Sequence, residues 1–470
     1  MSKKMGFWSI VLLTINSIIG TGIFLSPGSV VKMSGSMAAV IYICAAIFAA
    51  ILAVTFASAS KYVNKNGAAF AYAKAGFGKG MGFYVGITRF VSASIAWGVM
   101  ATGVIKTSLS IFHIDSNNLT YVTIGFLILM IILMIISMCG TKVFEIISNL
   151  STIGKLLALG ITIIAGIVIL MAGGVNHFSE INLLTDSTGA AIVPKMTVSN
   201  FVVAVIAAFY AFTGFESVAS GATDMENPEK NLPKAIPLAI GIIAIIYTGI
   251  VVVAMFIDPK ALIESDEVVV LASIFNNKII YNLVVYGAFI SMFGINVASS
   301  FHTPRLLEAL ASEHYVSNIF TKRTSKNFPL NSFILTALVA IVIPMAFRYQ
   351  MTSIMVISSI SRFIQFIIVP LAVIKFYYGK NAEPIIENAY KNKFTDVYCP
   401  ILSIALTCLL LIKFDWVGQF SLVVNGMRHM NFQAIAAMII GYIVLPMALW
   451  FLGNKGNVKN IKNSKLTKTF

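Results

Sequence analysis

The chain has 470 residues, of which 58% are hydrophobic and only 11% are charged, whereas soluble globular proteins carry about 25% charged residues. This balance excludes a soluble domain and indicates an all-α integral membrane protein. The formal net charge of +15 does not indicate nucleic-acid binding, because the basic residues follow the membrane topology.

Apolar segments of about 20 residues, enough to cross a hydrocarbon core of about 30 Å, recur along the chain. We predict twelve transmembrane helices with no soluble domain between them. The first has no small-residue cleavage site behind a short apolar core, so we expect a retained span and not a signal peptide. The predicted spans cover residues 7–31, 37–60, 81–112, 121–139, 147–173, 198–220, 234–257, 280–304, 330–347, 353–377, 398–414 and 432–453.

Lysine and arginine are unevenly divided between the two sides of these spans. With the amino terminus in the cytoplasm, 22 of the 33 basic residues fall on that side, about 8 fall on the other, and three lie within spans. Such an asymmetry follows the positive-inside rule. We therefore expect a multi-pass protein of the cell membrane with both termini cytoplasmic, ending in a basic tail at 454–470 near anionic lipid.

The cysteines and histidines lack the spacing of a metal site, and no cysteine falls in an outer loop. We expect packing or interfacial roles for these side chains, with no metal, cofactor or disulfide framework. They are Cys44, Cys139, Cys399 and Cys408, and His113, His177, His302, His314 and His429.

Spans one to five, within residues 1–173, match spans six to ten, within 198–377, at a nearly constant offset. Two peripheral spans remain in 398–453. Because five is odd, the second copy must enter the membrane from the opposite side. Inverted repeats of this kind are common in secondary transporters, which bind substrate at the repeat interface.

Both copies carry an interruption in their first span. Gly20 and Gly22 lie in "NSIIGTGIF", and Gly214 lies in "AFYAFTGFES", followed by Glu216. Lipid cannot satisfy freed backbone groups, so non-helical backbone at mid-depth indicates a cavity or ligand. The N-termini of half-helices attract a carboxylate and free carbonyls attract an ammonium, which together suit an amino acid. The alternative is that these glycines only allow close helix packing.

Four stretches resemble motifs of the amino acid–polyamine–organocation (APC) superfamily of transporters: "SIIGTGIFLSPG", "FYAFTGFES", "ENPEKNLPKAI" and "TPRLLEALASE". The resemblance implies a LeuT-like core of two inverted five-span repeats, with broken helices 1 and 6, and transport by alternating access. It also implies that Tyr210 closes over the substrate. Backbone groups would bind the substrate carboxylate through the amides of Thr21, Gly22 and Ile23, and its ammonium through the carbonyls of Ile18, Ile19, Tyr210 and Phe212.

Lys155 lies about 12 Å into the fifth span. A cation at that depth is costly unless it is paired, so it is a functional candidate. The resemblance implies that its amine lies against the broken first span, where sodium-coupled relatives bind their ion. We therefore expect sodium-independent transport, the alternative being a lysine that extends to the interface.

Arg89 and Arg362 converge near the same depth from spans three and ten, which would place two guanidiniums beside the substrate. An arginine pairs well with a second carboxylate, which favours an acidic amino acid such as glutamate, aspartate or anionic cystine. The stretches "TRFVSAS" and "SRFIQF" resemble the L-type and cystine/glutamate exchanger light chains. In the alternative, the arginines pair with Glu216 or with carbonyls and the substrate is a small neutral amino acid.

Glu216 is the only carboxylate that we place deep in a span, where it could carry a proton, gate the site or bond to backbone. The loop "HIDSNNLT" contains no cysteine, so we expect no disulfide-linked heavy chain. An enzyme would need converging acids, bases or metal ligands, and a channel would need a continuous polar pore. A transporter-like amino acid sensor stays open, as do exchange against proton symport and the oligomeric state.

Overall fold

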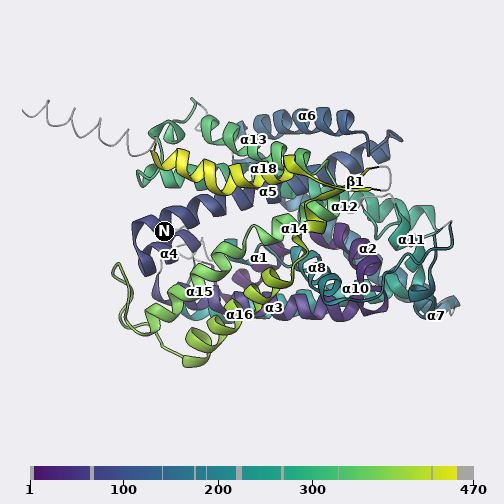
Figure 1. The fold of residues 1–470 in the computed structure, drawn as a ribbon, viewed down its shortest axis with the longest axis horizontal. Coiled ribbons are helices and arrows are strands. Elements are labelled where there is room, and N and C mark those ends of the chain that lie inside the picture. Colours follow the sequence, from purple (N-terminus) through teal and green to yellow (C-terminus); the bar gives the residue numbers. More distant parts are fainter. Residues whose placement is uncertain are drawn as a thin grey trace, which may run out of the picture.

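The structure is a computed structural model that describes residues 5–63, 68–139, 141–173, 176–186, 188–218, 225–265, 269–325, 328–424 and 427–451. The predicted basic tail at 454–470 lies outside these residues. Nearly all of the described chain is helical, and many of the long helices run roughly along the long axis of the molecule (Figure 1).

Continuous helices make up most of the bundle. They are α3 (Ala38–Tyr62), α5 (Lys79–Ile111), α6 (Leu119–Met138), α7 (Thr141–Gly173), α10 (Pro228–Ile257), α12 (Lys278–Ser312), α13 (Leu330–Ala346), α16 (Cys399–Lys413) and α18 (Phe432–Ile439). Shorter elements connect them: η1 (Gly35–Met37), α4 (Ala69–Phe77), η2 (Phe178–Leu183), α11 (Pro259–Glu264), η4 (Asn318–Thr321), η5 (Phe394–Tyr398), α17 (Trp416–Gln419) and η6 (Ile440–Val444).

Within the described residues, nine helical stretches are long and apolar enough to cross a membrane. One of them, Gly22–Tyr62, is 41 residues long and turns at Gly35, whose φ is 54°. Three further apolar helices are shorter: Phe7–Ile18, Val198–Tyr210 and Leu330–Ala346. The chain is thus an all-helical membrane protein, while the count of twelve spans and the inverted repeat stay predictions.

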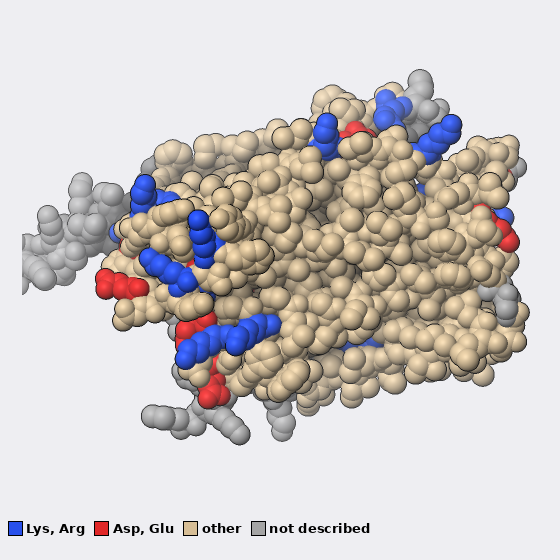
Figure 2. Space-filling view, turned by 90° about the horizontal axis from the view of Figure 1, so that it is seen from below, with Lys and Arg blue, Asp and Glu red and all other residues tan. Residues whose placement is uncertain are grey.

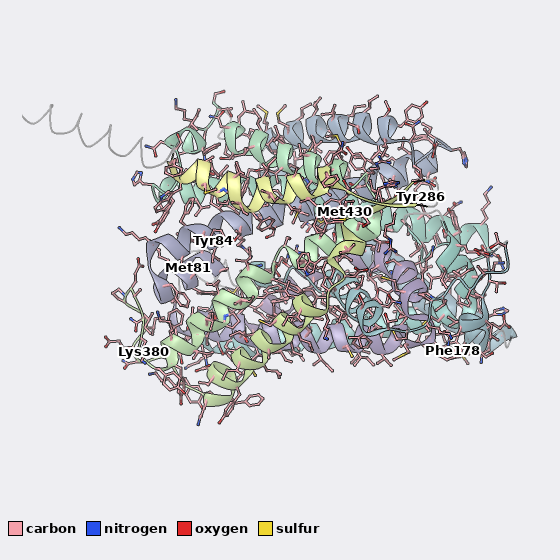
Figure 3. All side chains as sticks on the ribbon, viewed as in Figure 1. Met81, Tyr84, Phe178, Tyr286, Lys380 and Met430 are labelled. Carbon is pink, nitrogen blue, oxygen red and sulfur yellow. The ribbon has the colours of Figure 1, made fainter. Side chains whose placement is uncertain are left out.

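The surface has the character of a membrane protein. A broad face almost without charged side chains crosses the middle of the molecule, and charged groups gather mainly toward one end (Figure 2). Residues of predicted loops on opposite sides of the membrane also separate along the long axis in Figure 3, with Lys380 toward the left and Phe178 and Met430 toward the right.

The first and sixth predicted spans are both interrupted, as expected. Helix α1 (Phe7–Ile18) is separated from α2 (Gly22–Ser34) by residues 19–21, of which Ile19 has an extended backbone at φ −68° and ψ 92°. Helix α8 (Val198–Tyr210) is separated from α9 (Phe215–Val218) by a turn containing Gly214 at φ 119°. Because α1 packs beside α9 and α2 beside α8, the two broken segments run antiparallel with their interruptions side by side.

The tenth predicted span differs from the continuous helix we expected. Helix α14 (Met351–Ile360) and α15 (Phe363–Tyr377) are separated at Ser361 and Arg362. Both residues keep right-handed helical dihedral angles, so the irregularity is small and Met351–Tyr377 still forms one candidate span. No glycine or proline marks this place in the sequence.

A second buried carboxylate lies near the start of the candidate span Phe394–Lys413, at its end and not deep within it. Asp396 lies in η5, is fully buried, and contacts Lys61 Nζ at 2.5 Å and the Tyr62 hydroxyl at 2.7 Å. We had placed Asp396 in a loop, because only the packing of η5 against α3 brings it to a buried cation.

A small antiparallel hairpin is the exception to the helical fold. Strand β1 (Ser421–Val424) pairs with β2 (Met427–Met430), with Ser421 opposite Met430. The dipeptide Asn425-Gly426 between them is the strongest local sequence signal for a two-residue hairpin, so this element was predictable and we missed it.

Candidate substrate-binding site

The two interruptions touch through their backbones. A Cβ atom on Gly22 would lie 2.5 Å from the Cα atom of Ala211, and one on Gly214 would collide with the carbonyl oxygen of Ser17. Gly20 differs, since its Cβ would lie 3.7 Å from Ile295 in ordinary contact. Glycine is therefore required for close approach at 22 and 214, whereas at 20 packing alone does not require it.

Three consecutive backbone amides at the start of α2 have no acceptor. Within the described residues, the N–H groups of Thr21, Gly22 and Ile23 donate no hydrogen bond, whereas the next two amides, of Phe24 and Leu25, donate to the Thr21 carbonyl at 3.0 and 3.2 Å. All three residues are buried. Buried donors are rarely left unpaired, and a helix N-terminus attracts negative charge, so the geometry of these amides suits an anionic group.

The four carbonyls assigned to the substrate ammonium divide into two pairs. Ile18 and Phe212 have carbonyl oxygens that accept no hydrogen bond from the described residues. The Ile19 oxygen accepts from Lys155 Nζ at 2.7 Å, and the Tyr210 oxygen accepts from the Thr213 amide at 3.3 Å and its hydroxyl at 2.8 Å. Two of the four carbonyls thus already accept a hydrogen bond, and the assignment of all four to the substrate ammonium stays a prediction.

Tyr210 connects the two broken segments through its side chain. Its ring is buried, and its hydroxyl lies 3.4 Å from the hydroxyl oxygen of Thr21. Tyr210 therefore contacts the residue that precedes α2, while its closing over the substrate stays a prediction.

Lys155 lies against the end of α1. Its ammonium donates to the side-chain oxygen of Asn16 at 2.8 Å, the Asn16 carbonyl at 3.2 Å and the Ile19 carbonyl at 2.7 Å, and the residue is 3% exposed. A cation here balances the negative end of the α1 dipole. The amine therefore does not extend to the membrane interface.

Arg362 and Glu216 form a buried ion pair. Arg362 Nε lies 3.1 Å from Glu216 Oε1, and the Glu216 Oε2 atom accepts the Gly214 amide at 2.9 Å. A second nitrogen of Arg362 donates to the Ser358 carbonyl at 3.0 Å. The structure thus has the pairing that we held as the alternative to direct substrate contact, and it attaches α15 to the second interruption.

Arg89 belongs to the same charged cluster. It donates to the side-chain oxygen of Gln365 at 3.2 Å and interacts electrostatically with Glu216, Arg362 and Tyr72. Because the cluster contains two guanidiniums and one carboxylate, its formal charge is positive.

Sequence reasoning missed two polar side chains of this cluster. The Gln365 Nε2 atom and the Tyr72 hydroxyl are buried and have no hydrogen-bond partner among the described residues. Gln365 could have been found, because it lies three residues after Arg362 and so on the same helix face. Tyr72 could not, since it comes from α4, outside the predicted spans.

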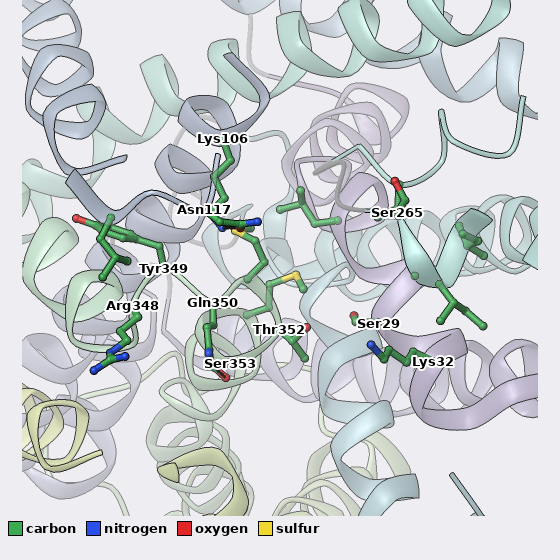
Figure 4. A pocket seen from close by; sticks show the side chains of 18 residues that line it. Ser29, Lys32, Lys106, Asn117, Ser265, Arg348, Tyr349, Gln350, Thr352 and Ser353 are labelled. Carbon is green, nitrogen blue, oxygen red and sulfur yellow. Dashed lines mark hydrogen bonds between the residues drawn. The ribbon is translucent and has the colours of Figure 1, made fainter. Parts of the chain in front are cut away.

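A cavity of about 680 Å³ lies at the end of the molecule where α2 ends and α14 begins. Its polar lining includes Lys32, Lys106 and Asn117, with the Lys106 ammonium 3.2 Å from the Asn117 side-chain oxygen (Figure 4). Its lining also includes buried residues, among them Leu25 and Met355. Residues 18–28 are all buried, and of these only Leu25 and Gly28 line this cavity, which we call the vestibule.

Paired helix interruptions with unsatisfied buried amides, set in an apolar helical bundle, define a membrane carrier. No group of three potential metal ligands occurs among the described residues. The chain belongs to the amino acid permease family, whose profile matches residues 5–447. It is therefore a multi-pass membrane transporter and not an enzyme, and its substrate is a small molecule.

Similar proteins come from several bacteria. An uncharacterized transporter of Mycobacterium tuberculosis is 38% identical over 454 residues, covering 94% of this chain and 93% of the relative. The serine/threonine exchanger SteT of Bacillus subtilis is 26% identical over 321 residues, covering 66% of this chain and 68% of the relative. The branched-chain amino acid permease BcaP of Bacillus subtilis is 22% identical over 454 residues, covering 89% of each.

Proposed function

We propose that this protein is a sodium-independent secondary transporter of amino acids in the cell membrane that works by alternating access. The observation that carries the proposal is the row of unsatisfied amides at Thr21, Gly22 and Ile23, which offers an α-carboxylate three donors at a helix N-terminus. The free carbonyl oxygens of Ile18 and Phe212 can accept hydrogen bonds from the α-ammonium of the same substrate.

Lys155 supports independence from sodium. Its ammonium uses carbonyl and amide oxygens that a sodium ion would otherwise coordinate, including the Ile19 carbonyl at the first interruption. The ammonium supplies a positive charge at this place, so no sodium ion needs to bind there for the site to form. Lys155 is a coupling residue in this proposal.

The positive charge of the Arg89, Arg362 and Glu216 cluster favours an acidic substrate. A side-chain carboxylate of glutamate, aspartate or anionic cystine would balance the excess cation. The orphaned donors of Gln365 and Tyr72 would gain an acceptor as well. In this form the protein is an exchanger related to the cystine/glutamate branch, with Glu216 and Arg362 also acting as a gate.

A small neutral amino acid is the second candidate. The 3.1 Å contact between Arg362 and Glu216 already occupies one guanidinium, which favours a structural role for that arginine. The serine/threonine exchanger and the branched-chain permease among the relatives carry neutral substrates by name.

Transport into proteoliposomes tests the proposal. Vesicles loaded with unlabelled glutamate or serine would receive labelled substrate, with a panel of amino acids as competitors, with sodium or choline outside, and with or without a pH gradient. We expect uptake that is unchanged by choline and inhibited most strongly by acidic amino acids. Loss of uptake in choline would overturn sodium independence, and stronger inhibition by serine would select the neutral substrate. Binding without flux would indicate a sensor.

A further inference from the structure

A second cavity lies on the outside of the bundle, away from the two interruptions. It has a volume of about 870 Å³ and is formed by α6, α13 and α18. Two of these helices belong to stretches that are only 28% buried within the protein, Leu119–Met138 and Phe432–Phe451. The cavity is therefore a groove on the lipid-facing side of the bundle, and it adjoins the vestibule, with which it shares the lining residues Leu119, Arg348 and Tyr349.

The groove is polar at one end and apolar along its length. At the end where α6 and α18 begin and α13 ends, its lining includes Thr120, Thr123, Arg348 and Gln433. One to two helical turns deeper, the walls become aliphatic with Ile124, Val342, Ala436, Ala437 and Ile440. At 1.5 Å per helical residue, this change occurs within about 10 Å, as it does between the headgroups and acyl chains of a lipid leaflet.

Arg348 places a fixed positive charge at the polar end. It is exposed and forms no ion pair with the described carboxylates. Its backbone lies in the left-handed region at φ 49°, and its N–H donates a hydrogen bond to the Met345 carbonyl at 2.9 Å. The next residue, Tyr349, is buried and contacts the Thr123 hydroxyl at 3.1 Å. Figure 4 shows the Arg348 guanidinium pointing away from Lys106 and Asn117, the centre of the neighbouring vestibule.

We propose that this groove binds one anionic phospholipid. Its phosphate pairs with Arg348, with Gln433 and Thr120 as neutral hydrogen-bonding partners, and an acyl chain fills the aliphatic channel between α6, α13 and α18. The unpaired guanidinium at the mouth selects an anionic headgroup over a zwitterionic one or a sterol hydroxyl. By the predicted topology, the lipid belongs to the outer leaflet.

Lipid binding to the full-length protein tests this site. The purified transporter would be titrated with phosphatidylglycerol or phosphatidylcholine of identical chains, with bound lipid counted by native mass spectrometry and thermal stability recorded in parallel. We expect one preferred phosphatidylglycerol, which raises the melting temperature more than phosphatidylcholine does. Equal binding of the two lipids would overturn the proposal.

Substitutions at two exposed residues test the headgroup contact and the acyl-chain contact of the lipid separately. Arg348→Gln removes the charge, and Ala436→Phe fills the aliphatic channel from an exposed position, so each should weaken phosphatidylglycerol binding about tenfold or more. Arg428→Gln, on the exposed strand β2 outside the groove lining, is the matched control and should leave binding unchanged. An equal loss in the control, or none with Ala436→Phe, would contradict the site.

Discussion

Gly22 and Ala211 are in direct backbone contact, since a Cβ atom on Gly22 would lie 2.5 Å from the Ala211 Cα atom. The two broken segments therefore meet without an intervening side chain. This contact fixes the amides at the start of α2 relative to the free carbonyl of Phe212, which belongs to the other segment.

Gly22→Ala should strongly reduce transport. Its methyl group would have to push the two interruptions apart, and overpacking of this kind costs about 1–3 kcal/mol. Gly20→Ala is the matched control, because its methyl group would meet Ile295 at an ordinary 3.7 Å and should have a much smaller effect. Transport rates of both variants, corrected for the amount of folded protein, test the contact. If both variants lose transport equally, the close approach to Ala211 is not the reason that glycine is needed at position 22.

Thr21→Pro should weaken substrate binding while leaving α2 in place. Thr21 already has a φ of −73°, which suits proline, and the substitution removes one of the three free amides. Loss of one hydrogen bond to a charged group is worth about 1.5–3 kcal/mol, or roughly a 10- to 100-fold loss of affinity.

Thr21→Val keeps the amide and removes only the hydroxyl, so its affinity should stay close to that of the original protein. Substrate affinity measured by competition in proteoliposomes distinguishes the two. If both variants bind equally well, the amide does not hold the carboxylate.

Arg362→Gln should lower stability by roughly 3–5 kcal/mol, because it leaves Glu216 buried without its cation. Glu216→Gln should lower stability by a similar amount, because it leaves Arg362 buried without its carboxylate. The double variant should be more stable than the sum of the two losses predicts, since neither charge remains unpaired. Thermal unfolding of the four proteins measures this coupling.

Glutamate inhibition of uptake in the same proteins separates the two proposed substrates. For an acidic substrate, Arg362→Gln should weaken glutamate inhibition far more than serine inhibition. If inhibition by glutamate and inhibition by serine weaken equally, Arg362 has a structural role only.

Asp396→Asn should destabilise the protein by a similar amount of about 3–5 kcal/mol, because Lys61 would lose its partner 2.5 Å away in a buried position. The exposed pair of Lys260 and Glu264, at 4.0 Å, provides the control. Glu264→Gln should change stability by less than about 1 kcal/mol, as surface ion pairs do. Thermal unfolding of both variants in one detergent compares their melting temperatures. Equal shifts in melting temperature would show that the buried pair stabilises the protein no more than the exposed pair does.

The sequence placed both interruptions correctly, because their signal is local. A helix inside lipid must satisfy its own backbone, so glycines at Gly22 and Gly214 in otherwise apolar segments mark departures from helix without knowledge of the neighbours. The depth of Lys155 could likewise be counted along its helix, and the structure brings its amine to the first interruption as the resemblance implied.

Partners across the bundle could not be predicted in the same way. Arg362 pairs with Glu216, Arg89 with Gln365, and Lys61 with Asp396, and each pair joins elements far apart in the chain. The sequence offered the pairing of an arginine with Glu216 only as one alternative, because nothing in either local sequence specifies which buried group a side chain will meet.

The amino-acid sequence alone determined the class of protein and the location of its broken helices, because hydropathy and glycine act over a few residues. Only the tertiary structure decided which carbonyls stay free and which cations are already balanced. The tertiary structure also decided which side chains meet at the polar end of the lipid-facing groove. These properties depend on distances of a few ångströms between helices, and those distances are set by packing of the whole bundle.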